Sequence, residues 1–273
     1  MIAGSTLRAT ACAHCGERWR RSLAAAFATL LLVSAFAAGG CGSQASGDET
    51  TNLTVYAAAS LTSAFTELGE KYMDDHPGTE VAFNFAGSQD LVAQLQQGAP
   101  ADVLATADTE TMEKVANLVG TQRIFAENEL TIAVAPGNPL GIESLDDLAN
   151  PDLKVVLAAP EVPAGAYSAQ VLKAAGVTVS AVSLEESVKG VVTKVALGEA
   201  DAGIVYVTDV TAAAGKVDAV EIPAKFNVVA TYPLAVVQAS AASEQAQEFV
   251  DLVLSADGQA ILAKYGFLAA QSQ

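Results

Sequence analysis

The stretch TVYAAASLTSAF, residues 54–65, passes from a strand-like start to a helix-like pattern without a glycine, lysine or arginine. Apolar residues recur at helical spacing from Leu61 to Tyr72, which predicts a helix over 61–73. The junction itself holds only three alanines and Ser60. Small side chains let another group approach the backbone closely, and a serine at a helix start leaves backbone N–H groups free nearby. The junction is therefore either a tight turn or one wall of a ligand site.

Segments with the character of strands and helices alternate along the rest of the chain. We expect strands at 53–57, 80–86, 102–106, 129–135, 154–159, 177–182, 202–207, 218–222 and 232–237. We expect helices at 61–73, 89–97, 144–150, 166–175, 187–197, 244–254 and 257–264, with another after Asp108. This alternation of short apolar strands with helices predicts an α/β fold with mainly parallel sheets.

Residues 1–41 have the composition of an export segment. Three arginines within 18–21 precede a long apolar run, and Cys41 follows that run directly. Cys41 is therefore predicted to carry a lipid, with residues 42–52 as a flexible tether and an extracytoplasmic, membrane-anchored location. Two alternatives stay open: ordinary cleavage beside an incidental cysteine, and an uncleaved membrane-spanning anchor.

Cysteine content and charge exclude several classes of protein. Cys12 and Cys15 have no second pair, so no zinc site is expected, and the absence of cysteine after Cys41 excludes a disulfide framework. The chain has a net charge of −17, and the part after Cys41 has 10 basic against 30 acidic residues. A net charge of −20 on that part excludes binding to nucleic acid, whose phosphates would be repelled.

Ligands of open α/β sheets bind beyond the carboxyl ends of the strands, where helices begin. In this sequence those corners carry small residues and hydroxyls, with no lysine or arginine in the loops themselves. Helix N-termini with free N–H groups suit an anion. Taken singly, each corner also has a plain structural interpretation, as a helix cap, a turn or a core tyrosine. Together they indicate an anion site.

Four motifs extend this interpretation: VYAAASLTSAF, AGSQDLVAQLQQGAPADVLATAD, VPAGAY and AGIVYVTD, in this order and spacing. With the closing AKYGF, they resemble the periplasmic molybdate-binding proteins of ABC transporters over essentially the whole chain after Cys41. The resemblance implies a two-lobed class II periplasmic-binding fold with crossover strands at 131–135 and 232–237. Lobe one would comprise 53–132 plus 236–273, and lobe two 133–235.

The resemblance also implies which residues contact the ligand. Matched motif by motif, they are the hydroxyls of Ser60, Ser88 and Tyr206 and the backbone N–H groups of Ala164 and Val188. Molybdenum would be held as molybdate, or tungsten as tungstate, through these groups with no direct metal ligand. No cofactor is expected. The partners would be the oxyanion, an ABC permease and, through the lipid, the membrane, with the protein itself a monomer.

Two positions leave alternatives open. If Ser183 opens a capping box, the helix begins directly after it and the Val188 N–H is already paired; if Ser187 is the cap, that N–H is free. Asp90, two residues past Ser88, departs from the family pattern. It either faces solvent or points inward, where it would repel a dianion and favour a protonated anion such as hydrogen phosphate.

The function that follows is delivery of molybdate to an ABC permease by a binding protein that is not an enzyme. The alternatives are a binder of sulfate or phosphate, and an exported hydrolase that uses Ser60 or Ser88 as nucleophile. A hydrolase needs a base beside the serine, and His76 is the one histidine after Cys41. His76 lies in DDHPG, a predicted surface turn, so the sequence favours binding over catalysis.

Overall fold

The computed structural model describes residues 50–270, and strand β1 (Thr51–Ala58) begins almost at once. The predicted export segment, with Cys41, lies outside the described residues. The described residues belong to one unit, 46–273. None of the helices within 50–270 has the length and hydropathy that a membrane span needs.

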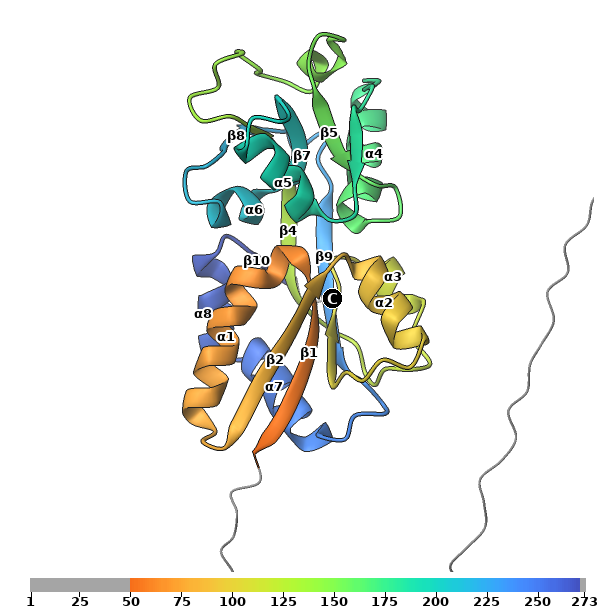
Figure 1. Cartoon of the computed structure of the whole chain (residues 1–273), viewed down its shortest axis with the longest axis vertical. Coiled ribbons are helices and arrows are strands. Elements are labelled where there is room, and N and C mark those ends of the chain that lie inside the picture. The colour runs from red at the N-terminus through yellow and green to blue at the C-terminus, as the bar shows by residue number, and fades with distance from the viewer. Residues whose placement is uncertain (1–49, 271–273) are drawn as a thin grey trace, which may run out of the picture. The chain divides into compact units, whose positions relative to one another are not determined.

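The first sheet has the strand order β2-β1-β3-β9-β4, and β10 also pairs with β4 (Figure 1). β1 pairs in parallel with β2 and β3, whereas β9 pairs antiparallel with β3 and β4. The other strands of this sheet are β2 (Thr79–Ala86), β3 (Val103–Ala105), β4 (Arg123–Val134), β9 (Val229–Val236) and β10 (Leu268–Ala269). Its helices are the 3-10 helix η1 (Ala59–Leu61), α1 (Thr62–Asp75), α2 (Ser88–Gln96), α3 (Thr109–Glu113), α7 (Ser243–Leu254) and α8 (Ala256–Lys264).

The second sheet continues from β4 in the order β4-β7-β5-β6, with β8 on the other side of β4. β5 pairs in parallel with β6 and β7, and β4 pairs antiparallel with β7 and β8. Its own strands are β5 (Val155–Ala158), β6 (Ser183–Glu185), β7 (Ala202–Tyr206) and β8 (Asp218–Glu221). Its helices are η2 (Asp146–Ala149), α4 (Pro163–Ala175), α5 (Val188–Ala196) and α6 (Val207–Ala212). The predicted α/β class is confirmed, since each sheet has a parallel core and β4 or β9 takes part in each antiparallel pair described above.

β4 is a member of both sheets. Its first part, Arg123 to Glu129, pairs with β9, and its second part, Leu130 to Val134, pairs with β7. Where the partner changes, the Asn227 side chain bonds both backbone groups of Leu130, at 2.9 Å to the carbonyl oxygen and 3.2 Å from the N–H. The predicted crossovers are thus the strands β4 and β9, although β4 begins earlier than expected.

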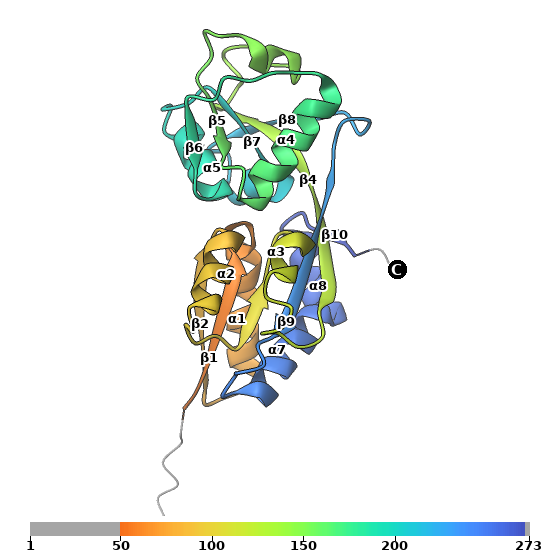
Figure 2. The same ribbon diagram turned by 90° about the vertical axis from the view of Figure 1, so that its right-hand side faces the viewer.

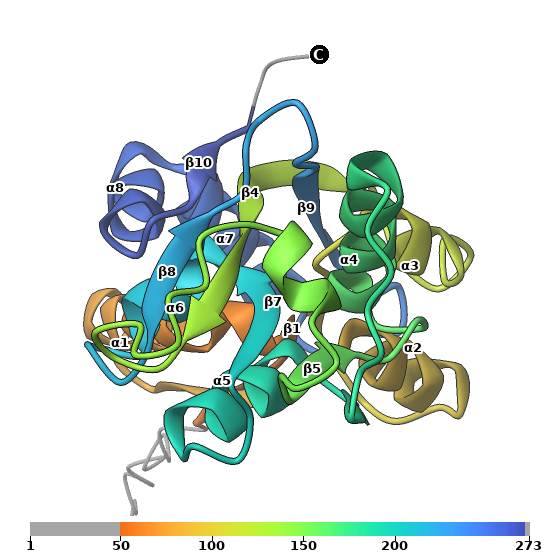
Figure 3. The same cartoon turned by 90° about the horizontal axis from the view of Figure 1, so that it is seen from above.

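β4 and β9 run along one flank of the unit, and α2 and α5 lie on the opposite flank (Figure 2 and Figure 3). We call the first sheet with its helices lobe one, and the second sheet with its helices lobe two. Because both crossovers lie on one flank, the opposite flank is where the facing ends of the lobes can part.

The helical spacing expected over 61–73 is confirmed. α1 buries Phe65 and Leu68 completely. The Phe65 ring centroid lies 5.6 Å from that of Phe125 on β4 and 6.0 Å from that of Phe249 on α7. Burial of each such side chain contributes roughly 1.5–3 kcal/mol. This packing fixes the N-terminal end of α1, and with it the alanine-rich junction, against the sheet.

Several elements differ from the sequence-based expectation. Segment 177–182 is irregular instead of extended, and β6 follows it at 183–185. The reason is its pairing: the Val182 N–H bonds the Val155 carbonyl, so the ladder with β5 starts only there. The helix expected at 144–150 is the shorter η2, and neither α6 nor β10 was expected.

Candidate functional site

A small cavity lies between the facing ends of the two lobes. Its volume is about 10 Å³, room for roughly one water molecule. All five predicted ligand residues line it: Ser60, Ser88, Ala164, Val188 and Tyr206. Corners that are far apart in the sequence therefore converge on one point, as the strand-end argument requires. Their role as ligands stays a prediction.

Ser88 is the first residue of α2, directly after β2 and the cap residue Gly87. Its side chain is buried, and its Oγ accepts a hydrogen bond of 3.0 Å from the Ala107 backbone N–H. A hydroxyl that accepts in this way keeps its own proton for another partner. Ser88 is thus oriented as a donor towards the cavity.

Ser60 lies in η1 at the end of β1 and is held by a buried chain of polar groups. Its Oγ is 3.1 Å from the hydroxyl oxygen of Tyr232 on β9. That oxygen accepts from the Nδ2 of Asn128 at 3.4 Å, and the same Nδ2 donates to Thr208 at 2.8 Å. The Ser60 Oγ and the Tyr232 hydroxyl are thus hydrogen-bonded to each other, and a hydroxyl in such a pair keeps capacity for one further partner at the cavity.

Tyr206 ends β7 and is 1% exposed. Among residues 50–270 its hydroxyl finds no hydrogen-bond partner, although it is buried. Burial raises the pKa of Tyr206 well above its usual value, so the hydroxyl keeps its proton and is a donor. A buried polar group without a partner is costly and rare, which marks this hydroxyl as one awaiting an acceptor.

The remaining two contacts are helix N-termini. Ala164 is the second residue of α4, after Pro163, and Val188 is the first residue of α5. The alternative left open at Val188 is settled, because Ser187 is the cap and accepts from the Gly190 N–H, while Ser183 lies in β6. The first N–H groups of a helix have no partner within it, so both termini present donors.

Gly165 permits the close approach of α4 to the strand before it. A Cβ at this position would lie 2.0 Å from the Ala159 carbonyl oxygen and 2.5 Å from that of Ala158. Any side chain would therefore push the α4 N-terminus, with Ala164, away from the end of β5. The glycine of the VPAG motif is thus required by packing within lobe two.

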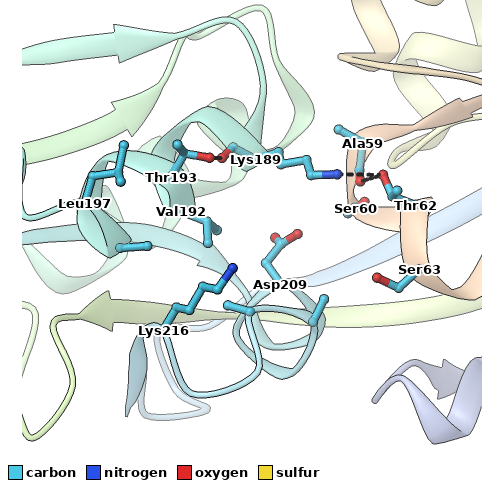
Figure 4. Close-up of a pocket in the computed structure, with 13 residues that line it drawn as sticks. Ala59, Ser60, Thr62, Ser63, Lys189, Val192, Thr193, Leu197, Asp209 and Lys216 are labelled. Atoms are coloured by element: carbon cyan, nitrogen blue, oxygen red, sulfur yellow. Dashed lines mark hydrogen bonds between the residues drawn. The ribbon is translucent and has the colours of Figure 1, made fainter.

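Charged groups lie beside the cavity instead of in it. A neighbouring groove of about 430 Å³ shares Ala59 and Ser60 with the cavity and contains Lys189, Lys216 and Asp209 (Figure 4). Asp209 is buried and accepts a 3.0 Å hydrogen bond from the Tyr206 N–H. Burial raises the pKa of Asp209 to about 7, against the opposing effects of that N–H and of Lys189.

The Asp90 side chain faces solvent, which is the first of the two orientations left open by the sequence. Its side chain is exposed and accepts from the Gln89 Nε2 at 3.1 Å. Partial burial, together with the charges of Glu186 and Glu161, raises its pKa. A carboxylate in this position complements the N-terminal end of α2 without lining the cavity.

The geometry does not support a hydrolase. His76 follows the C-terminal end of α1, whereas Ser60 lies just before its N-terminus, which separates them by roughly 20 Å of helix. The His76 ring stacks on Tyr72, and its Nδ1 is 2.9 Å from the Tyr72 carbonyl oxygen. The serine hydroxyls instead contact Tyr232 and the Ala107 N–H, neither of which is a general base.

A model of the bacterial extracellular solute-binding proteins matches residues 53–268. The chain belongs to this family. The molybdate-binding protein ModA of Mycobacterium tuberculosis (strain ATCC 25618 / H37Rv) is 44% identical over 219 residues, which cover 79% of this chain and 84% of that protein. The substrate-binding lipoprotein YvgL of Bacillus subtilis (strain 168), a putative ABC transporter component, is 30% identical over 90% of this chain and 96% of its own.

Solved structures of other solute-binding proteins share the fold. The periplasmic molybdate-binding protein of Azotobacter vinelandii superposes with a TM-score of 0.69 at 22% identity, over 80% of this chain and 100% of that one. The sulfate-binding protein SubI of Mycobacterium tuberculosis H37Rv gives 0.73 at 20% identity, over 81% and 88%. The predicted periplasmic-binding fold is thereby confirmed for this solute-binding protein.

Some residues of the site were not expected from the sequence. Tyr232 lies in a predicted crossover strand, yet nothing local to it indicates a contact with Ser60, 172 residues earlier. Asn128 and Asp209 are likewise unremarkable in the sequence. Lys189 directly follows Val188 on α5, so its position in the first turn of a predicted binding helix is the local signal that points to it.

Proposed function

We propose that this protein binds molybdate, and tungstate as well, between its two lobes and delivers it to an ABC permease. The relative from Mycobacterium tuberculosis bears the name of a molybdate-binding protein at 44% identity, which supports this ligand. The observation that carries the proposal is the convergence of five hydrogen-bond donors on one cavity that no lysine or arginine lines. The protein would act as a carrier without catalysis.

Donors alone are a selective way to hold a tetrahedral dianion. Each hydroxyl or N–H can donate a hydrogen bond to a ligand oxygen, so a fully deprotonated anion, whose oxygens only accept, satisfies all five donors. A hydrogen bond to a charged group contributes roughly 1.5–3 kcal/mol, and five of them suffice for sub-micromolar affinity, about −8 to −12 kcal/mol. A cavity of about 10 Å³ is too small to admit a tetrahedral oxyanion from outside, so the lobes would part for the ion to enter.

Sulfate is the second candidate, because SubI shares the fold with the higher of the two TM-scores. Sulfate is also a fully deprotonated tetrahedral dianion, and it is smaller than molybdate. The size of the ion relative to the spacing of the lobes, and not the charge of the ion, would therefore decide between sulfate and molybdate. Phosphate is disfavoured, since the Asp90 carboxylate, the acceptor considered for its proton, is exposed and does not line the cavity.

Calorimetric titration of the purified protein with molybdate, tungstate, sulfate and phosphate tests the proposal. We expect sub-micromolar binding of molybdate and tungstate and at least a hundredfold weaker binding of the other two. Tight sulfate binding with weak molybdate binding would move the protein to the second candidate. Absence of binding to all four ions would reject an oxyanion carrier altogether.

The family is extracellular, and we propose that a lipid on Cys41 holds this member at the outer face of the cytoplasmic membrane as a monomer. The support is the position of Cys41 straight after the apolar run. Cys41→Ser should move the protein from the membrane fraction to the medium. An unprocessed variant that stays in the membrane would show that the segment is a membrane-spanning anchor.

A further inference from the structure

Two side-chain hydrogen bonds cross from lobe one to the start of α5, one on each side of Val188. On one side the Nε2 of Gln89 donates to the Glu186 carbonyl oxygen at 2.9 Å. On the other side the Nζ of Lys189 donates to the Thr62 hydroxyl at 3.4 Å (Figure 4). α2 and α5, the helices that carry Gln89 and Lys189, lie on the flank away from the crossover strands (Figure 2). The two bonds therefore join the lobes where the lobes are free to part.

The donor residue of each bond directly follows a predicted ligand residue in the sequence. Gln89 follows Ser88 in the first turn of α2, and Lys189 follows Val188 in the first turn of α5. The Thr62 hydroxyl donates to the Ala59 carbonyl at 2.7 Å, which fixes its proton and leaves its lone pairs for Lys189. The bonds can thus form only when the binding corners of the two lobes face each other.

The close approach on the Gln89 side depends on a glycine. A Cβ at Gly87 would collide with the Gln89 side-chain amide and would also lie 2.6 Å from the Glu186 carbonyl oxygen, which belongs to the opposite lobe. The Oε1 of Gln89 is itself buried without a hydrogen-bond partner among residues 50–270. The cost of burying the Oε1 without a partner is thus borne in an arrangement in which the Nε2 makes the bond across the cleft.

We propose that Gln89 and Lys189 form a clasp that holds the lobes closed over the bound anion and so sets the rate at which it leaves. This inference rests on the proposed function. An anion inside so small a cavity leaves only when the lobes part, and parting breaks both bonds. The anion would enter between parted lobes, in which neither bond is formed. The clasp residues should therefore control the dissociation rate and leave the association rate nearly unchanged.

Lys216 provides a matched control. It lines the same groove as Lys189 and is exposed, and its side chain has no hydrogen bond or ion pair within the described part of the chain. Lys216→Ala and Lys189→Ala remove the same charge from the same groove, but only Lys189→Ala removes a bond between the lobes. A comparison of the two separates clasping from simple attraction of the anion.

The experiment is stopped-flow kinetics of molybdate binding to the wild type and to the Lys189→Ala, Gln89→Ala and Lys216→Ala variants. We expect Lys189→Ala and Gln89→Ala each to raise the dissociation rate about three- to tenfold, with the association rate changed less than twofold. Lys216→Ala should leave the dissociation rate unchanged. Thr62→Val should add little in the Lys189→Ala background, because it removes the other half of the same bond. Melting of the ligand-free variants checks that each of them folds.

Equal dissociation rates for Lys189→Ala and Lys216→Ala would overturn the clasp at Lys189. A Lys189→Ala variant that lowers only the association rate would overturn it as well. An unchanged dissociation rate in Gln89→Ala would overturn it at Gln89. In both cases the wild type still binds molybdate, so the proposed function stands. A wild type that binds none of the four oxyanions would instead reject the function, and the clasp with it.

Discussion

The two halves of the site are built on different plans. Lobe one offers the hydroxyls of Ser60 and Ser88, and both are already held by a neighbour, Tyr232 in one case and the Ala107 N–H in the other. Lobe two offers the Tyr206 hydroxyl, which has no partner within residues 50–270, and the N-termini of two helices. Lobe one is thus prepared before the ligand arrives, whereas lobe two becomes satisfied only with an acceptor in place.

This difference predicts that the two lobes contact the anion at different stages of binding. We expect the anion to dock first on lobe one, whose donors are already oriented. The unsatisfied groups of lobe two then favour the closed arrangement, because only closure brings them an acceptor. Substitutions that act on one lobe or on the contact between the lobes can test this comparison.

The largest contrast is expected between two glycines. Gly165→Ala places a Cβ 2.0 Å from the Ala159 carbonyl oxygen inside lobe two, so it should lower the free energy of unfolding by roughly 3 kcal/mol. Gly87→Ala places a Cβ 2.6 Å from the Glu186 carbonyl oxygen across the cleft, so it should spare stability but weaken binding at least tenfold. Denaturant unfolding and calorimetry measure both quantities. Equal loss of stability in the two variants would contradict the division between lobe packing and closure.

The acid beside Tyr206 should make stability depend on pH. The pKa of Asp209 rises from 3.8 to about 7 on folding, so between these values the folded protein holds a proton that the unfolded chain has released. Its contribution to stability therefore falls as pH rises from about 4 to 7, by roughly 4 kcal/mol, and is level above that. Tyr206, Tyr232, Lys189 and Lys216 are the other titratable groups around it.

Asp209→Asn keeps an oxygen for the Tyr206 N–H but cannot ionise. The difference in unfolding free energy between the variant and the wild type should therefore increase from pH 4 to pH 7 in favour of the variant. Urea unfolding at a series of pH values measures this difference and cancels the other acidic groups. A difference that does not vary with pH would show that Asp209 titrates normally.

Removal of one hydroxyl from each lobe should weaken binding alike but change stability differently. Ser88→Ala and Tyr206→Phe each remove one hydrogen bond to a charged ligand, about 1.5–3 kcal/mol, or ten- to a hundredfold in affinity. Ser88→Ala also leaves the buried Ala107 N–H without its acceptor, which should cost about 1–3 kcal/mol without ligand. Tyr206→Phe removes a hydroxyl that has no hydrogen-bond partner among residues 50–270, so the ligand-free protein should be as stable as the wild type or slightly more so. Thermal melts with and without molybdate, and calorimetry, distinguish the two effects.

Unchanged affinity in both variants would reject the assignment of these two ligands. Loss of affinity in Ser88→Ala alone would place the anion on lobe one without a contribution from lobe two. Equal stability of both ligand-free variants would show that the Ala107 N–H finds another acceptor, and would remove the contrast between a prepared and an unsatisfied lobe.

The smallest effect is expected from salt. The chain after Cys41 has a net charge of −20, so a dianion is repelled at long range. Screening acts over about 8 Å at physiological ionic strength, and added neutral salt should raise the association rate modestly. A rate that falls with salt would show that Lys189 and Lys216 outweigh the overall charge near the cleft. Stopped-flow measurements at increasing sodium chloride concentration give the sign directly.

That several corners meet at one cavity could be predicted, because each corner follows a strand and the small residues and hydroxyls there are local information. The choice of Ser60, Ser88 and Tyr206 as ligands came from the family resemblance and stays a prediction. The choice between Ser183 and Ser187 as the cap was not local, since it depends on whether 183–185 pairs with β5. The contact between Tyr232 and Ser60 and the reach of Lys189 to Thr62 depend on how the two lobes meet, which no short motif encodes.

The continuity of β4 has a further consequence for the lobes. Between Glu129 and Leu130 the strand changes sheets without a loop, so both lobes share one pleat and one alternation of side chains. An inserted residue in a loop would only lengthen a connection. One residue inserted between Glu129 and Leu130 would reverse the alternation in one lobe relative to the other. The number of residues in β4 therefore determines how the side chains of one lobe are oriented relative to those of the other.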